Sequence, residues 1–270
     1  MFTKGFVPGF VWEEDGRIVG NVSLLESSFP GRYLIANVAV DPEYRRRGIA
    51  RGLMEVAVEH IRQLGGQTIL LQVEERNKPA ISLYESLGLT NLGVMKQWET
   101  TASRLRIPTL DKESLTGIRP IGRGDWRAAA KLDAAVVDPD LNWPSPLPAA
   151  HFKAGFWHSV GDFLNGRRVE TWVGDTVDGN GRRKRLIGFA AVFSEWGRPH
   201  QLTTRVDAKW RDKITAPLLV RSLARAKRSR GGVYRINHPS NDEITSQTLE
   251  EMNFKARRAL AVMRLQLTDE

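Results

Sequence analysis

The residues whose types and spacing could do chemistry lie between Val40 and Ala50, where Asp41-Pro42 is followed by Arg45-Arg46-Arg47 and Gly48. An apolar run precedes this segment and a pattern of helical period follows it, so the arginines stand where a strand gives way to a helix. A helix N-terminus presents unpaired backbone N–H groups and a partial positive charge, and it therefore suits a phosphate group. Gly48 lets a ligand approach the backbone with no side chain in the way. The segment matches neither the nucleotide P-loop nor the dinucleotide-binding pattern. A basic first turn on a surface helix is the alternative interpretation.

The elements that must position these residues begin with a hairpin and continue as a strand, a helix and a second strand. Asp15-Gly16 suits the tight turn of a hairpin over residues 7–25. A strand is expected over residues 33–40, and the helix that starts at Gly48 is expected to stop at Gly65-Gly66. The strands on either side of this helix should be parallel and joined by a right-handed crossover.

A second spaced set of residues follows the next expected strand, residues 68–73. It consists of Asn77, which can cap a short helix, then Ala80 and Tyr84 on that helix, and Gly88 at its end. The order strand, Arg-x-x-Gly-x-Ala, helix, strand and Asn-x-x-Ala-x-x-x-Tyr-x-x-x-Gly resembles the GCN5-related N-acetyltransferase (GNAT) superfamily. The resemblance is close over residues 34–90, fair over 7–33, and weak but repeated over 117–267. It implies an α/β fold with a mixed α+β sheet in two GNAT-like domains, N-acetyltransferase activity, acetyl-CoA as co-substrate and no metal.

The resemblance also implies which residues hold acetyl-CoA. Backbone groups of Val38 and Val40, on a bulged strand, would contact the pantetheine arm, and the amides from Arg45 to Ala50 would hold the pyrophosphate. Asn77 would contact the pantetheine or hold the splayed strand end. The full set implied for the co-substrate is Val38, Ala39, Val40, Arg45, Arg46, Arg47, Gly48, Ile49, Ala50, Arg51 and Asn77.

Tyr84 stands where the family places a general acid that protonates the departing CoA thiolate. A phenol with a pKa of about 10 can donate to a thiolate whose pKa is about 8.5. The alternative interpretation of Tyr84 is a helix aromatic packed on the sheet with its hydroxyl satisfied.

Two departures from the family pattern stand out. Where some members carry a base on the strand before the arginines, this chain has Leu34 and Asn37, and on the next strand it has Gln72. Glu74, Glu75 and a water relay remain candidates for the base that deprotonates the amine. The family normally begins with a strand and two helices that wall the acceptor site, whereas this chain starts at the hairpin. Either further residues precede those given, or the second domain supplies the wall.

Composition limits the remaining classes of function. The chain has 270 residues, of which 41% are hydrophobic and 26% charged, as in a globular protein of two domains. The absence of cysteine excludes disulfides, Cys-ligated zinc and a thiol nucleophile. No apolar run approaches the ~20 residues of a membrane helix, and no signal peptide is visible. We therefore expect a cytoplasmic protein with no membrane partner.

The second half of the sequence repeats the pattern of the first. Val206-Asp207, followed by a basic stretch, echoes Val40-Asp41, and residues 248–254 echo residues 83–89. We infer two copies of one fold. The second copy is degenerate, because Ile214 takes the place of Gly48 and Leu249 that of Tyr84. We expect a catalytic domain at residues 1–100, a linker at 101–116 and a degenerate copy at 117–270. The copy would serve as scaffold, as a wall of the acceptor site or as an oligomer surface, and the sequence leaves a homodimer open.

The formal net charge of +9 belongs entirely to this second half. Residues 1–115 contain 14 basic and 14 acidic residues, and residues 116–270 contain 26 and 17. The basic residues gather at residues 182–185 and at Arg221, Arg225, Lys227, Arg228 and Arg230. A solvated face is the ordinary interpretation, and attraction to an acidic substrate or to nucleic acid is the other. Six of the eight tryptophans also lie here, and we expect most of them in the core, while Trp143 in a Pro-rich loop could meet a ligand.

The leading hypothesis is therefore an acetyl-CoA-dependent N-acetyltransferase that acts on a small-molecule amine or a peptide N-terminus. A CoA-binding module without turnover is the second hypothesis, and a nucleic-acid-binding protein is a distant third.

Overall fold

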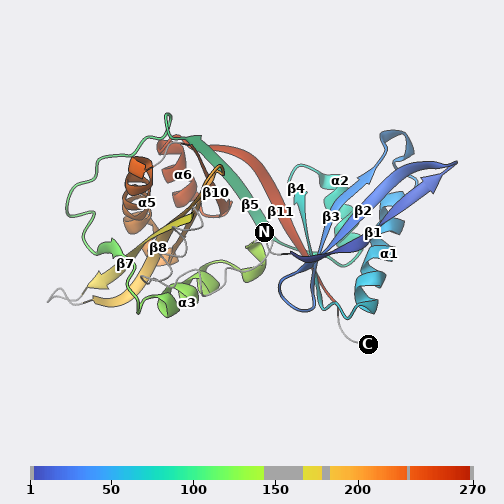
Figure 1. Ribbon diagram of the computed structural model, residues 1–270, viewed down its shortest axis with the longest axis horizontal. Coiled ribbons are helices and arrows are strands. Elements are labelled where there is room, and N and C mark those ends of the chain that lie inside the picture. The colour runs from blue at the N-terminus through green and yellow to red at the C-terminus, as the bar shows by residue number, and fades with distance from the viewer. Residues whose placement is uncertain (1–2, 143–166, 178–182, 230–231, 268–270) are drawn as a thin grey trace. The chain divides into compact units, whose positions relative to one another are not determined.

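The computed structural model describes residues 3–142, 167–177, 183–229 and 232–267 (Figure 1). The chain divides into two compact units. Unit 1 consists of residues 1–94, 140–146 and 260–270, and unit 2 consists of residues 95–139 and 147–259. Trp143, Arg182 and Arg230 lie outside the described residues.

Unit 1 is built on a mixed sheet with the strand order β1-β2-β3-β4-β11. Its elements are β1 (Thr3–Glu14), β2 (Arg17–Ser27), β3 (Arg32–Val40), the 3-10 turn η1 (Pro42–Tyr44), α1 (Ile49–Gln63), β4 (Thr68–Glu74), α2 (Lys78–Ser86), the start of β5 (Thr90–Thr101) and the end of β11 (Lys255–Gln266). β3 and β4 are parallel, as expected of strands on either side of a helix, whereas β1–β2, β2–β3 and β4–β11 are antiparallel.

Local signals in the sequence account for the boundaries of these elements. Asp15 and Gly16 form the hairpin turn with φ of 52° and 74°, a left-handed conformation that short polar residues and glycine tolerate. α1 begins directly after Gly48, whose φ is 83°, and Gly65 follows its C-terminal cap. At α2 the Asn77 side chain accepts a hydrogen bond from the Ala80 N–H at 3.3 Å, which confirms the predicted cap.

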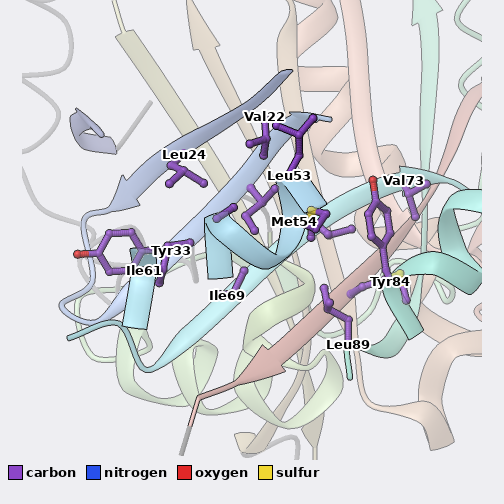
Figure 2. Packing of buried hydrophobic residues seen from close by; sticks show 14 of the residues in the cluster. Val22, Leu24, Tyr33, Leu53, Met54, Ile61, Ile69, Val73, Tyr84 and Leu89 are labelled. Atoms are coloured by element: carbon purple, nitrogen blue, oxygen red, sulfur yellow. The ribbon is translucent and has the colours of Figure 1, made fainter. Parts of the chain in front are cut away.

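The core of unit 1 joins both helices to one face of the sheet (Figure 2). Leu53 and Met54 of α1 are buried against Val22 of β2, and Tyr84 of α2 belongs to the same cluster as Val73 of β4. The apolar side chains of α1 recur at three- and four-residue steps, so the helix can bury one face only. This packing holds the N-termini of α1 and α2 against the sheet.

Unit 2 has the strand order β5-β10-β9-β8-β7-β6. Its elements are β6 (Ile118–Pro120), α3 (Trp126–Val136), the 3-10 turn η2 (Pro139–Leu141, which continues into unit 1), β7 (Arg167–Val177), β8 (Arg183–Glu195), β9 (His200–Val206), the 3-10 turn η4 (Ala208–Trp210), α5 (Arg211–Ser229), β10 (Val233–Pro239) and α6 (Glu243–Glu251). Successive residues of β8 face opposite sides of the sheet, so Phe189 packs in the cluster of α3 and Ala190 in the cluster of α5.

The two units repeat one order of elements but exchange their last strands. β5 follows α2 along the chain, yet it pairs with β10 in unit 2. β11 follows α6, yet its residues 260–266 pair with β4 in unit 1. A compact unit is therefore not one continuous stretch of sequence. The linker predicted at residues 101–116 separates the two copies of the repeat along the sequence. That boundary stays a prediction.

Pro217 lies inside α5, six residues after the first residue of this helix, Arg211. Pro217 cannot donate a helical hydrogen bond, but Ile214 and Leu218 on either side of it pack against β8. Within the segment interpreted as a linker, Leu105 is 4% exposed and belongs to the core of unit 2, while the linker assignment stays a prediction. Within the described ranges, no helix is both long and apolar enough to cross a membrane.

Candidate functional site

The centre of the candidate site is the point in unit 1 where two parallel strands part. β3 and β4 pair from Arg32 and Thr68 to Ile35 and Leu71, although each strand continues beyond that point. Helices α1 and α2 start just after the ends of these strands. In sheets with parallel strands, ligands bind at this carboxyl end, where strands separate and helices begin. The sequence-predicted residues from Val38 to Arg51, and Asn77, all lie on these strand ends and helix starts.

A bulge in β3 lies where the pairing with β4 ends. Ser23 of β2 is opposite Ala36, and Asn21 is opposite Ala39, so two residues of β3 face one residue of β2. Asn37 has a φ of 53°, which asparagine tolerates better than the apolar residues around it. The bulge expected from the family resemblance is thus present. After it, the Asp41 N–H donates to the Val19 carbonyl at 2.8 Å.

The backbone direction of β3 follows from that hydrogen bond. N–H groups along a strand point alternately to its two sides, so the N–H groups of Ala39 and Asp41 face β2. Those of Val38 and Val40 therefore face the side on which β4 has parted. The Val40 carbonyl accepts a bond from Arg45 Nε at 3.2 Å. The chain thus presents strand N–H groups to open space beside the bulge.

The loop before α1 presents a second set of backbone donors. Arg46 and Gly48 have φ of 65° and 83°, and the first helical hydrogen bond runs from the Gly52 N–H to the Gly48 carbonyl at 3.0 Å. The N–H groups of Ile49, Ala50 and Arg51 precede that bond and have no helical acceptor. A Cβ placed on Gly48 would have no atom within 4 Å. No atom thus occupies the place that a side chain of residue 48 would take beside these donors.

A small set of contacts fixes the conformation of the loop. Asp41 accepts a bond from the Glu43 N–H at 3.1 Å and pairs with Arg17 at 2.8 Å. The guanidinium of Arg47 lies 4.7 Å from the centre of the Tyr44 ring. Sequence reasoning missed Arg17 and Tyr44, because their roles depend on contacts that no local pattern shows.

The arginine side chains near the loop are held mostly by the protein itself. Arg45 bonds to Val40, and Arg47 donates to the Glu43 carbonyl at 3.2 Å. Arg51 donates to Ser86 Oγ at 2.7 Å and so ties α1 to α2. These bonds tie the side chains of Arg45 and Arg47 to the loop, and the predicted contacts of the arginines with the co-substrate stay a prediction.

Tyr84 lies with its ring in the core and its hydroxyl at the edge of the core. The residue is 6% exposed and packs in the same cluster as Val73 and Leu89 (Figure 2). The described part of the chain gives its hydroxyl no hydrogen-bond partner, yet the oxygen is not among the fully buried unpaired atoms. Burial raises the pKa of the Tyr84 phenol, so the hydroxyl is protonated at neutral pH and can donate. Tyr84 is thus packed in the core as the alternative interpretation expects, and its role as a general acid stays a prediction.

The candidates for a base are not brought together with Tyr84 by any contact that the structure describes. Glu74 ends β4 and is half-buried, while Glu75 is exposed. Leu34 is buried, and Asn37 forms the bulge. The choice among Glu74, Glu75 and a water relay stays open.

Two cavities among the described residues are lined by residues of unit 2. One, of about 480 Å³, is lined by residues 195–200 with Gly232 and Val233, and the other, of about 140 Å³, lies at the ends of β5 and β10. Among the described residues, no group of three or more metal-ligating side chains could hold a metal ion.

Residues 3–89, which contain the bulge, the Gly48 loop and Tyr84, match the family described as Acetyltransferase (GNAT) family. This segment is a GNAT domain. It is similar to the [Ribosomal protein bS18]-alanine N-acetyltransferase of Escherichia coli strain K12, at 38% identity over 65 residues, which are 24% of this chain and 44% of that protein. It is also similar to the peptidyl-lysine N-acetyltransferase YiaC of the same organism, at 37% identity over 91 residues, 34% of this chain and 56% of that protein.

The whole chain has the fold of a tandem GNAT protein. A solved tandem GNAT protein from the clavulanic acid biosynthesis pathway superposes with a TM-score of 0.52 at 16% identity, over 96% of this chain and 82% of that one. The inference of two copies of one fold is thereby confirmed. The chain spans only about half of the curated relatives that match the GNAT domain, so their activities are not evidence for the whole protein.

The second GNAT copy has the same parted strands and the same aspartate cap as the first copy. It lacks the open loop whose backbone N–H groups are the donors in unit 1. β9 and β10 pair only as far as Leu202 and Ile236 and then part, as β3 and β4 do. Asp207 accepts from the Lys209 N–H at 3.2 Å, as Asp41 does from Glu43. However, α5 begins at Arg211, directly after η4, so a helical turn replaces the open loop.

The predicted equivalence of Ile214 with Gly48 is wrong by one residue. A Cβ on Gly188 of β8 would meet Ile214 and Leu218, just as a Cβ on Gly20 of β2 would meet Ile49 and Leu53. Ile214 therefore corresponds to Ile49. The second copy is one residue shorter in this loop, because the chain is helical there and needs no left-handed glycine. Leu249, in the position of Tyr84, is fully buried.

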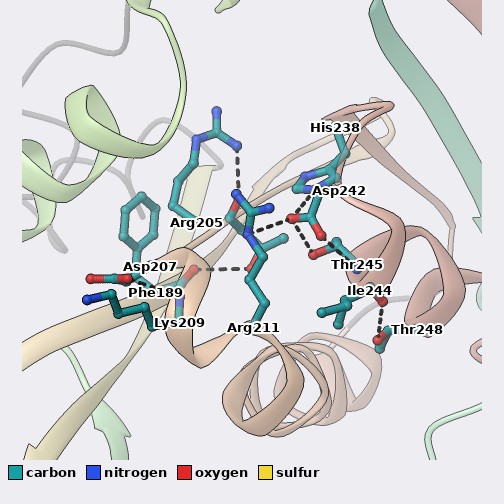
Figure 3. A network of polar contacts seen from close by, with 11 residues as sticks. Phe189, Arg205, Asp207, Lys209, Arg211, His238, Asp242, Ile244, Thr245 and Thr248 are labelled. Atoms are coloured by element: carbon teal, nitrogen blue, oxygen red, sulfur yellow. Dashed lines mark hydrogen bonds and ion pairs between the residues drawn. The ribbon is translucent and has the colours of Figure 1, made fainter.

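A network of charged side chains occupies the space where β9 and β10 part (Figure 3). Arg205 Nε donates to Asp133 Oδ1 at 2.7 Å, and both residues are buried. Asp242 accepts from the Thr245 N–H at 3.0 Å and lies 3.0 Å from His238 Nε2. Burial lowers the pKa of His238, which favours its neutral form. The second copy thus fills its own slot.

Three basic residues on α5 have partners within the protein. Arg221 lies over the Trp172 ring, Arg225 pairs with Glu170 at 3.6 Å, and Lys227 donates to the Leu105 carbonyl at 3.2 Å. These contacts favour the solvated-face interpretation over nucleic-acid binding. One tryptophan contradicts the expectation of a core position, since Trp196 is 79% exposed.

Proposed function

We propose that the protein is an acetyl-CoA-dependent N-acetyltransferase whose catalytic site is the GNAT domain of unit 1. The observation that carries the proposal is the open Gly48 loop, which follows a bulged strand that has parted from β4. The backbone donors of this loop suit a pyrophosphate, and the strand N–H groups beyond the bulge suit the amide-bearing pantetheine arm.

Different residues of unit 1 have different roles in the proposed acyl transfer. The amides of Gly48, Ile49 and Ala50 hold the pyrophosphate, and the N–H of Val40 meets the pantetheine. The N–H of Val38 donates to the thioester carbonyl, where negative charge develops. A neutral amine attacks the carbonyl carbon, the C–N bond forms and the C–S bond breaks. Tyr84 then donates its proton to the departing thiolate, and the proton released by the amine leaves through the base or through water.

The acceptor is proposed to be a primary amine, on a small molecule or at a peptide N-terminus. One relative is named for an alanine of ribosomal protein bS18 and another for peptidyl lysine, so both kinds of amine occur among similar proteins. Unit 2, whose own slot is filled, is proposed to act as scaffold, as a wall of the acceptor site or as an oligomer surface.

A CoA-binding module without turnover is the second candidate. It is favoured by the absence of a carboxylate at Leu34, Asn37 and Gln72, where some GNAT members carry a base.

Thiol release from acetyl-CoA in the presence of a panel of amines tests the proposal, together with calorimetric titration with CoA. An acetyltransferase releases thiol in proportion to the amine acetylated, and Tyr84→Phe reduces that rate while CoA affinity is retained. CoA binding with no thiol release for any amine, unchanged in Tyr84→Phe, supports the module instead. No CoA binding at all refutes both.

A further inference from the structure

The bulge of β3 is held by side chains from the neighbouring strand. Asn21 Nδ2, on β2, donates to the Asn37 carbonyl at 2.7 Å. Asn37 Nδ2 in turn donates to Ser23 Oγ at 3.3 Å. The first bond restrains the backbone of the bulge, and the second restrains only the side chain of Asn37.

The bond from Asn21 sets the direction of one peptide group. The Asn37 carbonyl and the Val38 N–H belong to the same trans peptide, so they point in opposite directions. Asn21 lies on β2 and holds the carbonyl toward that strand. The Val38 N–H is consequently directed away from β2, toward the side on which β4 has parted.

The second copy provides an internal comparison. β8 and β9 pair without a register shift from Gly188–Val206 to Phe193–Gln201, so β9 has no bulge. The contacts of Gly20 and Gly188 make them equivalent, and the residue after each is Asn21 in unit 1 and the fully buried Phe189 in unit 2. The copy that lacks the open loop also lacks the bulge and the asparagine.

We propose that Asn21 is a positioning residue for acyl transfer, which holds the Asn37–Val38 peptide so that the Val38 N–H meets the thioester carbonyl. The proposal rests on the acetyltransferase function proposed above and adds a residue that acts through the backbone of another. A strand residue that only stabilised the sheet would need no bond to the one carbonyl that reverses direction at the bulge.

The test compares Asn21→Asp with Ser23→Ala in the full-length protein. Asn21→Asp keeps the shape of the side chain but replaces the donor with an acceptor, which turns the Asn37 carbonyl away. Ser23→Ala removes the second bond on the same bulge and serves as the matched control. Asn21→Ala is the second variant, in which no new repulsion is introduced. The measurements are kcat and KM for acetyl-CoA with the best amine of the panel, the Kd for CoA and the thermal midpoint.

Removing a donor to a developing oxyanion lowers kcat by roughly 100- to 1000-fold. Because the Val38 N–H is misdirected and not removed, we expect kcat to fall about 10- to 100-fold in both Asn21 variants. CoA itself has no thioester carbonyl, so its Kd and the KM for acetyl-CoA should stay within about twofold. Ser23→Ala should retain kcat within about twofold.

Three results overturn the inference: unchanged kcat in the Asn21 variants, an equal loss in Ser23→Ala, or a loss of kcat that parallels losses of CoA affinity and thermal midpoint. The last pattern is that of a merely structural residue. A wild-type protein that releases no thiol refutes the proposed function itself, and this result is separate from the comparison of variants.

Discussion

The role of the Gly48 loop can be tested by adding a single methyl group. Gly48 has a φ of 83°, and a Cβ built on it would meet no atom within 4 Å. Gly65, beyond the other end of α1, has a φ of 74° and the same open surroundings. Gly48→Ala and Gly65→Ala therefore impose the same backbone strain without a clash, and only the first places a methyl group in front of the proposed phosphate donors.

The two variants should lose similar stability. An L-residue in the left-handed conformation costs about 1–2 kcal/mol, and the lower chain entropy of unfolded alanine offsets roughly 0.4–1 kcal/mol of it. We expect each variant to lose about 1 kcal/mol of unfolding free energy, measured by urea denaturation without ligand. This loss leaves both proteins folded for binding measurements.

Their affinities for CoA should differ. A hydrogen bond to a charged group contributes about 1.5–3 kcal/mol, and a methyl group that pushes the pyrophosphate away from one amide removes about that much. Since 1.4 kcal/mol corresponds to a factor of ten, the Kd of Gly48→Ala should rise about 10- to 100-fold. Calorimetric titration with CoA measures both variants, and Gly65→Ala should bind as the wild type does. Equal CoA affinity in the two variants would refute the assignment of the loop as the pyrophosphate site.

Three further predictions concern proton donation and the charged network of unit 2. Tyr84→Phe should lower kcat by about 100-fold or more, with CoA affinity unchanged, because the ring stays packed while the proton donor is lost. Steady-state kinetics measures kcat and calorimetry measures CoA affinity. An unchanged kcat excludes the acid role. Asp133→Leu or Arg205→Met alone should destabilise the protein by about 3–5 kcal/mol, because each removes one partner of a buried ion pair. The double variant should lie near the wild type in urea denaturation, and additive losses would contradict the pairing. The protein should lose stability as the pH falls. Burial lowers the pKa of His238, so the unfolded chain takes up its proton first, below about pH 6.5. Burial raises the pKa of Asp242, but bonds from His238 and Thr245 bring it down to about 2, which adds a second loss as the pH falls through about 4 to 2. Urea denaturation of the wild type and of His238→Gln should be compared from pH 8 to pH 5. The free energy of unfolding should fall with pH only in the wild type, and an equal fall in both proteins would assign the loss of stability to another group.

Much of unit 1 could be predicted because its signals are local. Asp15-Gly16 specifies a tight turn, and Asn77 before Lys78-Pro79 specifies a helix start. Gly48 stands where only a left-handed residue connects the loop to α1. Each of these residues determines its own backbone conformation, so the sequence around it suffices.

The features that could not be predicted depend on residues far away in the sequence. Asn37 is a visible interruption of an apolar strand, but its partner Asn21 is identified only once the register of β2 and β3 is known. The true equivalent of Ile214 required the contacts of Gly188, because a one-residue deletion in a helical turn leaves no mark in a comparison without gaps. β5 pairs with β10 and β11 pairs with β4, although each strand follows the other copy in sequence. The edges of β4 and β10 that these strands cover are similar, so no local sequence pattern predicts which strand pairs with which edge.

That exchange of strands gives residues that follow the second copy a structural role in unit 1. Residues 260–266 of β11 pair with β4, and Ala261 and Met263 are fully buried in the core of unit 1. β4 carries the strand end at which the candidate site opens, so its far edge must be covered for the strand to stay in place. The second copy supplies this cover whether or not it binds a ligand. Its own loop, bulge and acid position are then free to change, and in unit 2 they hold a helical turn, a regular strand and a buried leucine. Unit 2 thus lacks the open loop and the bulge of the candidate site, while residues 260–266, which follow the second copy in sequence, complete the sheet of unit 1.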